Sequence, residues 1–98
     1  MFIKIHKSYR TVVAVCDEEL IGKKFEEGKA QLDVRESFYK DKKITESEAV
    51  KILKQQSYED ATFNIVGEKS TQAAIEAGIT SEESIARINN IPFVLILV

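Results

Sequence analysis

The chain has 98 residues, of which 44% are hydrophobic and 31% are charged, and its formal net charge is −2. This is the size of one domain with a modest core, and the balance of apolar and charged residues excludes a disordered chain. The 14 basic and 16 acidic side chains leave no basic excess, which disfavours general coating of nucleic acid but is compatible with a local basic patch.

The single cysteine, Cys16, and the single histidine, His6, limit the available chemistry. One cysteine cannot form an internal disulfide, and these two residues alone cannot build a zinc site, so we expect a reducing, cytoplasmic setting. The N-terminus lacks the apolar core of a signal peptide, and the longest apolar run, residues 91–98, is too short to span a bilayer. We therefore expect no membrane partner.

The N-terminal pattern predicts a hairpin of two strands followed by a helical turn. Residues 1–7 alternate apolar and polar side chains, as in a half-buried strand, and residues 11–16 are apolar on both faces, as in a central strand. Asp17 suits the N-cap of a single helical turn over residues 17–22, where a glycine ends the turn.

The next segment predicts a turn, a strand and a loop. Residues 23–28 are expected to form a turn with Phe25 as its apolar anchor. Residues 29–35 alternate again and predict a second half-buried strand. Residues 40–43 are polar and predict a loop.

The C-terminal half predicts helix, strand, helix, helix and strand. Residues 45–56 are the clearest helix, because a threonine with glutamate three positions later forms a capping box before an apolar stripe. Residues 61–66 predict a strand, and residues 68–77 and 80–88 predict short helices. Residues 91–98 predict an apolar strand, which can return parallel to the strand at 61–66 through a right-handed crossover.

These elements predict one α/β (α+β) domain over residues 1–98. We expect a mixed sheet of about five strands, with an antiparallel N-terminal part and a C-terminal β-α-α-β crossover. The helices are expected to pack on the sheet, and the chain shows no internal repeat or linker.

No pattern in the chain identifies a catalytic residue, a cofactor or a metal site. Cys16 lies between a strand and an acidic turn whose carboxylates would raise a thiol pKa, so it is interpreted as a buried structural thiol. His6 has no serine or cysteine partner in a recognisable motif and is interpreted as a surface residue.

The segment at residues 64–71 resembles a phosphate-binding loop but departs from it. A Walker loop needs two glycines with four residues between them before Lys-Ser/Thr, and Glu68 stands in place of the second glycine. A weaker anion site stays open at Gly67, Lys69 and Ser70, because a strand–glycine–helix junction presents free N–H groups. Helix capping explains the same residues.

Two groups of basic and aromatic residues are candidates for a binding surface. The first group comprises Lys4, Lys7, Tyr9 and Arg10, and the second comprises Phe38, Tyr39, Lys40, Lys42 and Lys43. If they are neighbours in the fold, they have the composition that single-stranded RNA binding uses. Lys23 and Phe25 are added to this binding hypothesis because the fold does not explain them. A solvated charged loop is the alternative interpretation.

Several short strings together resemble a known family. They are Val13-Ala14-Val15-Cys16-Asp17, Leu20-Ile21-Gly22-Lys23, Phe25, Gly28, Phe38-Tyr39, Asn64-Ile65-Val66-Gly67-Glu68 and Ile91-Pro92. The combination resembles domain-of-unknown-function family 424, a family of small archaeal proteins, over nearly the whole chain. The resemblance implies an archaeal source and a single α/β domain, and it brings no established activity and no catalytic residue.

Three functions stay open at this point. The favoured one is a non-enzymatic binding module for RNA or a ribonucleoprotein, such as the translation machinery. The second is a small enzyme, or a protein that binds an anion or small ligand, with its site between Cys16 and Gly28 and near Gly67. The third is a homodimeric protein adaptor joined through the last strand.

Overall fold

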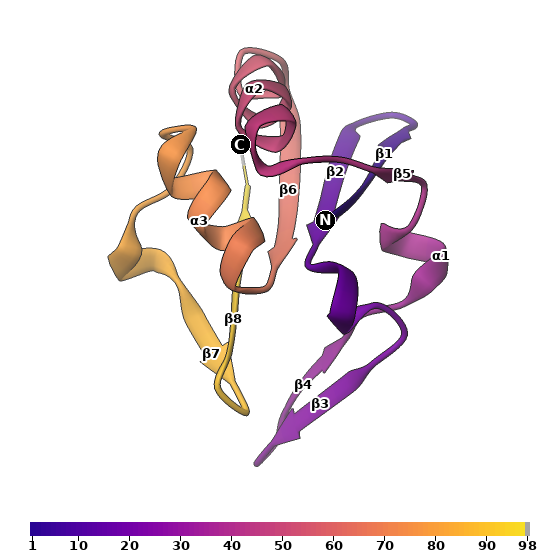
Figure 1. Ribbon diagram of the computed structural model, residues 1–98, viewed down its shortest axis with the longest axis vertical. Helices are drawn as coiled ribbons and strands as arrows, with labels where there is room; N and C mark the ends of the chain where they lie inside the picture. The colour runs from indigo at the N-terminus through magenta and orange to yellow at the C-terminus, as the bar shows by residue number, and fades with distance from the viewer. Residues whose placement is uncertain (98) are drawn as a thin grey trace.

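The structure is a computed structural model that describes residues 1–97, and its elements are drawn in Figure 1. The strands are β1 (Phe2–Lys7), β2 (Thr11–Cys16), β3 (Lys24–Glu27), β4 (Ala30–Asp33), β5 (Lys42–Lys43), β6 (Ala61–Val66), β7 (Ala86–Ile88) and β8 (Ile91–Ile96). The helices are α1 (Glu36–Tyr39), α2 (Glu46–Gln56) and α3 (Glu68–Glu76), with single 3-10 turns η1 (Glu18–Leu20) and η2 (Glu82–Ser84).

The main sheet has six strands in the order β5-β1-β2-β6-β8-β7, and β3 and β4 form a separate hairpin. The sheet is mixed: β1 is antiparallel to β2 and to β5, whereas β2 is parallel to β6. The α+β class with a mixed sheet and packed helices, predicted from the sequence, is therefore confirmed. The antiparallel N-terminal hairpin is confirmed as well.

The C-terminal connection differs from the predicted crossover. The expected helix at residues 80–88 is instead η2 followed by β7, and β8 runs antiparallel to both β6 and β7. The reason lies at Asn89 and Asn90, whose positive φ angles of 51° and 65° are those of a two-residue hairpin turn. Asparagine tolerates this conformation, so the chain reverses at once and no crossover to a parallel strand forms.

Two short strands lie where the sequence predicts a turn and a loop. Residues 23–28 contain β3 and residues 40–43 contain β5, whereas the short helix α1, just before β5, was not predicted. β3 carries a single apolar side chain and β5 has only two residues, so neither shows the alternation by which a strand is recognised.

Side chains from the main sheet point to two faces that are covered differently. Ile3, Val13 and Phe63 point to the helix face, which packs against α2 and α3 in the larger core. The opposite side, which we call the open face, carries Lys4 and Asn64. Only part of it is covered, by η1, α1 and the β3–β4 hairpin, which form a second core. In Figure 1, α2 and α3 lie together on one side, and α1 lies beyond β1.

The capping box predicted for α2 is confirmed. The backbone N–H of Glu48 donates to the Thr45 hydroxyl at 3.2 Å, and the N–H of Thr45 donates to the Glu48 carboxylate at 2.9 Å. These hydrogen bonds from Thr45 lower the pKa of Glu48. By contrast, η2, which begins after Ser81, has no side-chain cap.

Replacing Thr45 by alanine should lower the free energy of unfolding by about 1 kcal/mol, because one N-terminal N–H group of α2 loses its acceptor. Urea denaturation followed by circular dichroism measures this change. Ser47→Ala, in the first turn of the same helix, is the matched control and should leave stability within about 0.5 kcal/mol. Equal effects of the two substitutions would show that the cap is not formed.

Candidate functional site

The carboxyl ends of β2 and β6 lie side by side, because these strands are parallel neighbours. Asp17 directly follows β2, and Gly67 directly follows β6 and precedes α3. The Asp17 carboxylate is 2% exposed and accepts hydrogen bonds from the backbone N–H groups of Lys69 and Ser70, at 3.1 and 2.8 Å. The Ser70 hydroxyl also donates to it, at 2.7 Å. A carboxylate from the N-terminal half thus caps a helix that is distant in sequence.

This arrangement changes the interpretation of two predicted features. Asp17 holds the N-cap position of η1, but its side chain makes no capping bond there and reaches α3 instead. The weak anion site hypothesised at Gly67, Lys69 and Ser70 lies at the same point, and the carboxylate from within the chain occupies its N–H groups.

Gly67 has no tolerated substitute at this junction. Its φ of +112° is rarely adopted by other residues, and an added Cβ would lie 2.3 Å from the Asp17 Cγ atom. The close approach of the Asp17 side chain to the Gly67 backbone explains why a glycine follows β6.

Asp17→Ala should be among the most destabilising polar substitutions in this chain, lowering the free energy of unfolding by about 2–3 kcal/mol. The physical reason is that it leaves the buried donors of α3 without an acceptor. Chemical denaturation measures the loss, and Glu19→Ala, an exposed carboxylate in the same turn, is the control. Asp17→Asn should recover part of the stability, because its carbonyl oxygen can still accept; no recovery would contradict this capping role.

Cys16 is fully buried beneath this junction, as interpreted from the sequence. Burial, together with the charge of Asp17, raises the pKa of its thiol to about 12. The thiolate form is therefore scarce at neutral pH, so the residue is a poor nucleophile.

The buried thiol should react with a small disulfide reagent at pH 8 far more slowly than a free cysteine. A pKa of about 12 instead of 9.0 reduces the thiolate fraction about a thousandfold. The rate is measured from the absorbance of the thiol that the reagent releases, and the rate in native buffer is compared with the rate for the same protein in urea. Rapid native labelling would contradict the buried assignment.

Because the folded pKa of Cys16 is raised, stability should also fall as the pH rises from about 9 towards 12.

The structure brings the two basic and aromatic groups of the sequence together in part. Phe2, Lys4 and His6 alternate along β1 onto the open face, where α1 lies against β1 and β2. The His6 ring stacks on the Phe38 ring at 4.6 Å between centroids, and its Nε2 lies 2.8 Å from the Phe38 carbonyl oxygen. The Lys4 ammonium donates to the carbonyl of Ser37 at 2.8 Å.

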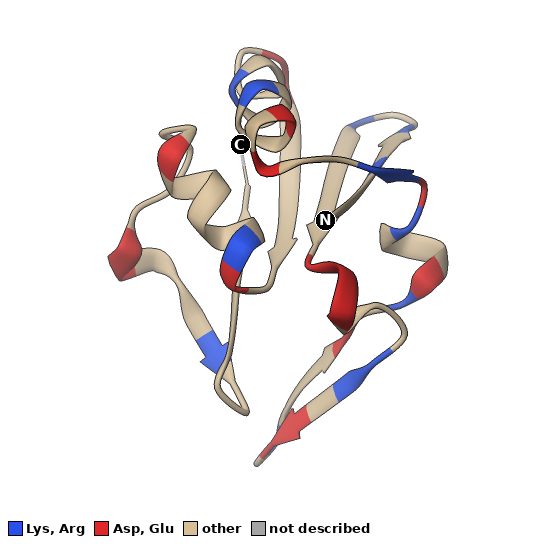
Figure 2. Ribbon diagram, viewed as in Figure 1, with Lys and Arg blue, Asp and Glu red and all other residues tan. Residues whose placement is uncertain are grey.

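The β5 end of the sheet extends this cluster. The Lys40 ammonium lies 5.5 Å above the centre of the Phe2 ring, and Lys43 is opposite Phe2 in the β1–β5 pairing. We call the set Phe2, Lys4, His6, Phe38, Lys40 and Lys43 the basic–aromatic surface. Figure 2 shows the basic residues of β5 at the edge of the main sheet and the acidic residues of η1.

Acidic residues partly balance this surface. Lys43 pairs with Glu18 at 2.8 Å, and Lys40 pairs with Glu36 at 3.8 Å. The hydrogen bond from Lys43 lowers the pKa of Glu18, so this carboxylate stays ionised at neutral pH. Two ammonium groups of the surface are therefore paired with exposed carboxylates.

The other residues of the binding hypothesis lie elsewhere. Lys42 is opposite Ile3 and belongs to the helix face, so it points away from the surface. Lys23 is exposed in the link between η1 and β3, and Phe25 packs into the second core. Tyr9 lies fully exposed in the β1–β2 turn.

A cavity of about 160 Å³ lies beside the basic–aromatic surface. Its lining residues come from β4, α1, β6 and β8 and are Leu32, Tyr39, Asn64, Ile65, Val66, Phe93, Val94 and Leu95. Tyr39 joins it to the surface, because its ring contacts the Phe38 ring edge-on at 5.0 Å. Burial raises the pKa of Tyr39 to about 12, so its hydroxyl is a hydrogen-bond donor at neutral pH.

Asn64 is the residue of this cavity that sequence reasoning missed. It is half-buried on the open face, and its side chain makes no hydrogen bond to another residue within the described part of the chain. The signal was present, because Asn64 is a carboxamide in the otherwise apolar centre of β6. The pairing that places it beside Tyr39 is not visible in the sequence.

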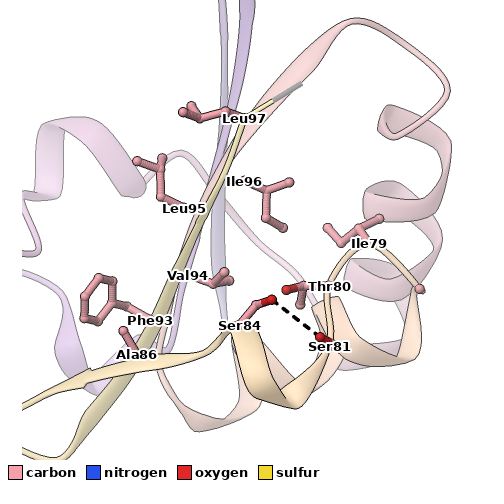
Figure 3. A pocket seen from close by; sticks show the side chains of 11 residues that line it. Ile79, Thr80, Ser81, Ser84, Ala86, Phe93, Val94, Leu95, Ile96 and Leu97 are labelled. Carbon is pink, nitrogen blue, oxygen red and sulfur yellow. Dashed lines mark hydrogen bonds between the residues drawn. The ribbon is translucent and has the colours of Figure 1, made fainter.

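A larger groove of about 630 Å³ runs beside the C-terminal half of β8 (Figure 3). Its lining residues, none of them charged, are Gly78, Ile79, Thr80, Ser81, Ser84, Ala86, Phe93, Val94, Leu95, Ile96 and Leu97. Neither this groove nor the cavity contains Asp17, Lys23 or Ser70.

Two further findings concern the described residues as a whole. Within residues 1–97, no group of three or more His, Cys, Asp or Glu side chains is arranged to hold a metal ion. Every helix in that range is too short or too polar to cross a lipid bilayer.

The fold and site define a small α+β protein with an internally capped helix and a basic–aromatic patch on a partly open sheet. The chain belongs to the family described as "Protein of unknown function (DUF424)", whose pattern matches residues 6–98. This confirms the resemblance seen in the sequence.

One solved structure is closely similar. It is described as the crystal structure of an uncharacterized conserved protein from Methanopyrus kandleri. The sequences are 29% identical, the TM-score is 0.86, and the match covers 97% of this chain and 88% of that one. No curated protein matches this chain.

Proposed function

We propose that the protein is a binding module, not an enzyme, and that its partner is single-stranded RNA or a single-stranded segment of a ribonucleoprotein such as the translation machinery. The observation that supports this is the basic–aromatic surface, which joins residues of β1 with residues of α1 and β5. Ammonium groups beside half-buried aromatic rings suit phosphates and unstacked bases. We also propose a cytoplasmic location, because a single cysteine cannot form an internal disulfide.

The cavity beside the surface is suited to one base. The row across the sheet joins Lys4, Ala14, Asn64 and Leu95, so Lys4 and Asn64 are two strands apart, roughly 10 Å. A phosphate at Lys4 and a base in the cavity can therefore belong to neighbouring nucleotides. The Asn64 carboxamide both donates and accepts hydrogen bonds, as the edge of a base requires, and Tyr39 adds a donor.

The charges make the proposed interaction selective rather than general. Lys40 and Lys43 already have carboxylate partners, so a phosphate must compete with Glu36 and Glu18. Exposed ion pairs of this kind are worth about 1 kcal/mol or less, which a phosphate can replace. The net charge of −2 opposes long-range attraction of duplexes, so the ring faces and the cavity must contribute much of the affinity.

Short single-stranded RNA should bind with an affinity that falls as salt rises. Lys4→Ala, Lys40→Ala and Lys43→Ala together should reduce the slope of log K against log salt by about 2, since each phosphate contact contributes about 0.7. Fluorescence anisotropy at several salt concentrations measures this. The matched control combines Lys29→Ala, Lys51→Ala and Lys54→Ala, which are exposed lysines outside the surface.

Two results would contradict the proposal. One is the absence of salt-dependent binding to any single-stranded homopolymer, and the other is an equal loss in the control variant.

Asn64→Leu should leave the salt slope unchanged while removing preference among the homopolymers, because it deletes the polar group of the cavity without touching a lysine.

A further inference from the structure

β8 is paired with β6 on one side from Phe93 to Ile96, and with β7 on the other side only along its first half. β6 pairs with it through Ile96, whereas β7 pairs only with Ile91 to Phe93. Beyond Phe93, no described strand of residues 1–97 lies on that side of β8. The second half of β8 is therefore a free sheet edge, and it borders the groove in Figure 3.

The hairpin fixes the direction of the backbone groups at this edge. In a two-residue hairpin the flanking residues, Ile88 and Ile91, exchange hydrogen bonds with each other. Backbone N–H and C=O groups point to alternate sides along a strand. Those of the odd-numbered residues of β8 therefore point towards β7, and those of the even-numbered residues point towards β6. The Gly67 N–H agrees, since it donates to the Pro92 carbonyl from the β6 side at 2.8 Å. The N–H and C=O groups of Leu95 and Leu97 consequently point to the free edge.

The side chains of the same two residues are unusually exposed. Leu95 is 56% and Leu97 is 72% exposed, and Figure 3 shows them on one side of β8 with Ile96 on the other. Natural edge strands are normally protected by charge, proline or a covering segment. This half of β8 has no charged residue and no proline, and no described strand of residues 1–97 pairs with it on this side; residues of the segment 78–84 line the uncharged groove beside it.

We propose that this edge pairs antiparallel with the same edge of a second copy of the chain, around a two-fold axis at Ile96. Leu95 then lies opposite the second copy's Leu97, and Leu97 lies opposite its Leu95. Each such pair exchanges backbone hydrogen bonds in both directions.

A second copy fits this edge better than an unrelated strand for a physical reason. The segment supplies donors and acceptors in an order that is its own complement under a two-fold rotation. The two exposed leucines of each copy meet on one face of the sheet, so the apolar surface that each leaves in water is covered by the same residues. No charged side chain lines the groove that receives the second strand.

The proposed pairing also has a consequence for the open face. A two-fold axis between antiparallel strands of one sheet is perpendicular to that sheet, so the open faces of both copies lie on the same side. The dimer would carry its two basic–aromatic surfaces on the same face but near opposite ends of the joined sheet, because β1 and β5 lie at the end of the sheet away from β8. The pairing itself does not depend on what those surfaces bind.

Analytical ultracentrifugation of the full chain at micromolar concentration tests the association. We expect a dimer for the wild type and a monomer for Leu95→Lys with Leu97→Lys, because like charges then face each other across the axis. Tyr9→Lys with Tyr58→Lys, which alters exposed aromatic residues elsewhere, is the matched control and should remain dimeric. A monomeric wild type, including one that binds only a different protein, would overturn the proposal.

A cross-linking experiment tests the register and does not depend on the stability of the lysine variant. In a Cys16→Ser background, Ile96→Cys places two thiols opposite each other at a pair with Cα atoms about 4.5 Å apart, within the range of a disulfide. Leu95→Cys is the control, because its counterpart in the second copy is displaced by two residues. Mild oxidation should give at least a tenfold excess of cross-linked dimer for Ile96→Cys. Equal yields, or cross-linking of Leu95→Cys alone, would overturn the proposed pairing.

Discussion

The Asp17 carboxylate at the start of α3 is the interaction on which this fold depends. It links the end of β2 to the helix that follows β6, through the N–H groups of Lys69 and Ser70. The Asp17 N–H donates to the Val66 carbonyl at 3.1 Å, and the Gly67 N–H donates to Pro92 in β8 at 2.8 Å. One aspartate and one glycine therefore hold three strands and a helix together where β2 and β6 end.

This constraint decides where a partner can bind. In sheets with parallel strands, ligands often bind beyond the carboxyl ends, where helix N-termini offer free N–H groups. Here Asp17 fills that position from within the chain, so the point that most resembles an anion site serves the fold. The surfaces left open are those that helices do not cover: the face beside α1, with Lys4 and Asn64, and the edge of β8.

The parts of the fold that were predictable are those encoded over short distances. The alternation of apolar and polar residues predicts β1, apolar runs predict β2 and β8, and the capping pair Thr45 and Glu48 predicts the start of α2. The remainder depends on information that local patterns do not carry. Asp17 acts 53 positions away at Ser70. The turn at residues 89–90 needs two positive φ angles that asparagine permits but does not require, and it converts an expected crossover into a hairpin. The basic–aromatic surface was predictable in composition, whereas the cavity at Asn64 needed the sheet order.

Leu95 connects the two proposals, because its side chain lines the cavity and its backbone lies at the free edge of β8. On the proposed pairing, the second copy's Leu97 packs beside Leu95 and so borders the cavity. A base held between Asn64 and Phe93 would then contact a more complete apolar wall in the dimer than in the monomer. Binding and dimerisation are then linked: the factor by which dimerisation raises the affinity for the base equals the factor by which the bound base raises the dimerisation constant. The physical basis of such coupling is one leucine at the meeting point of a sheet face and a sheet edge.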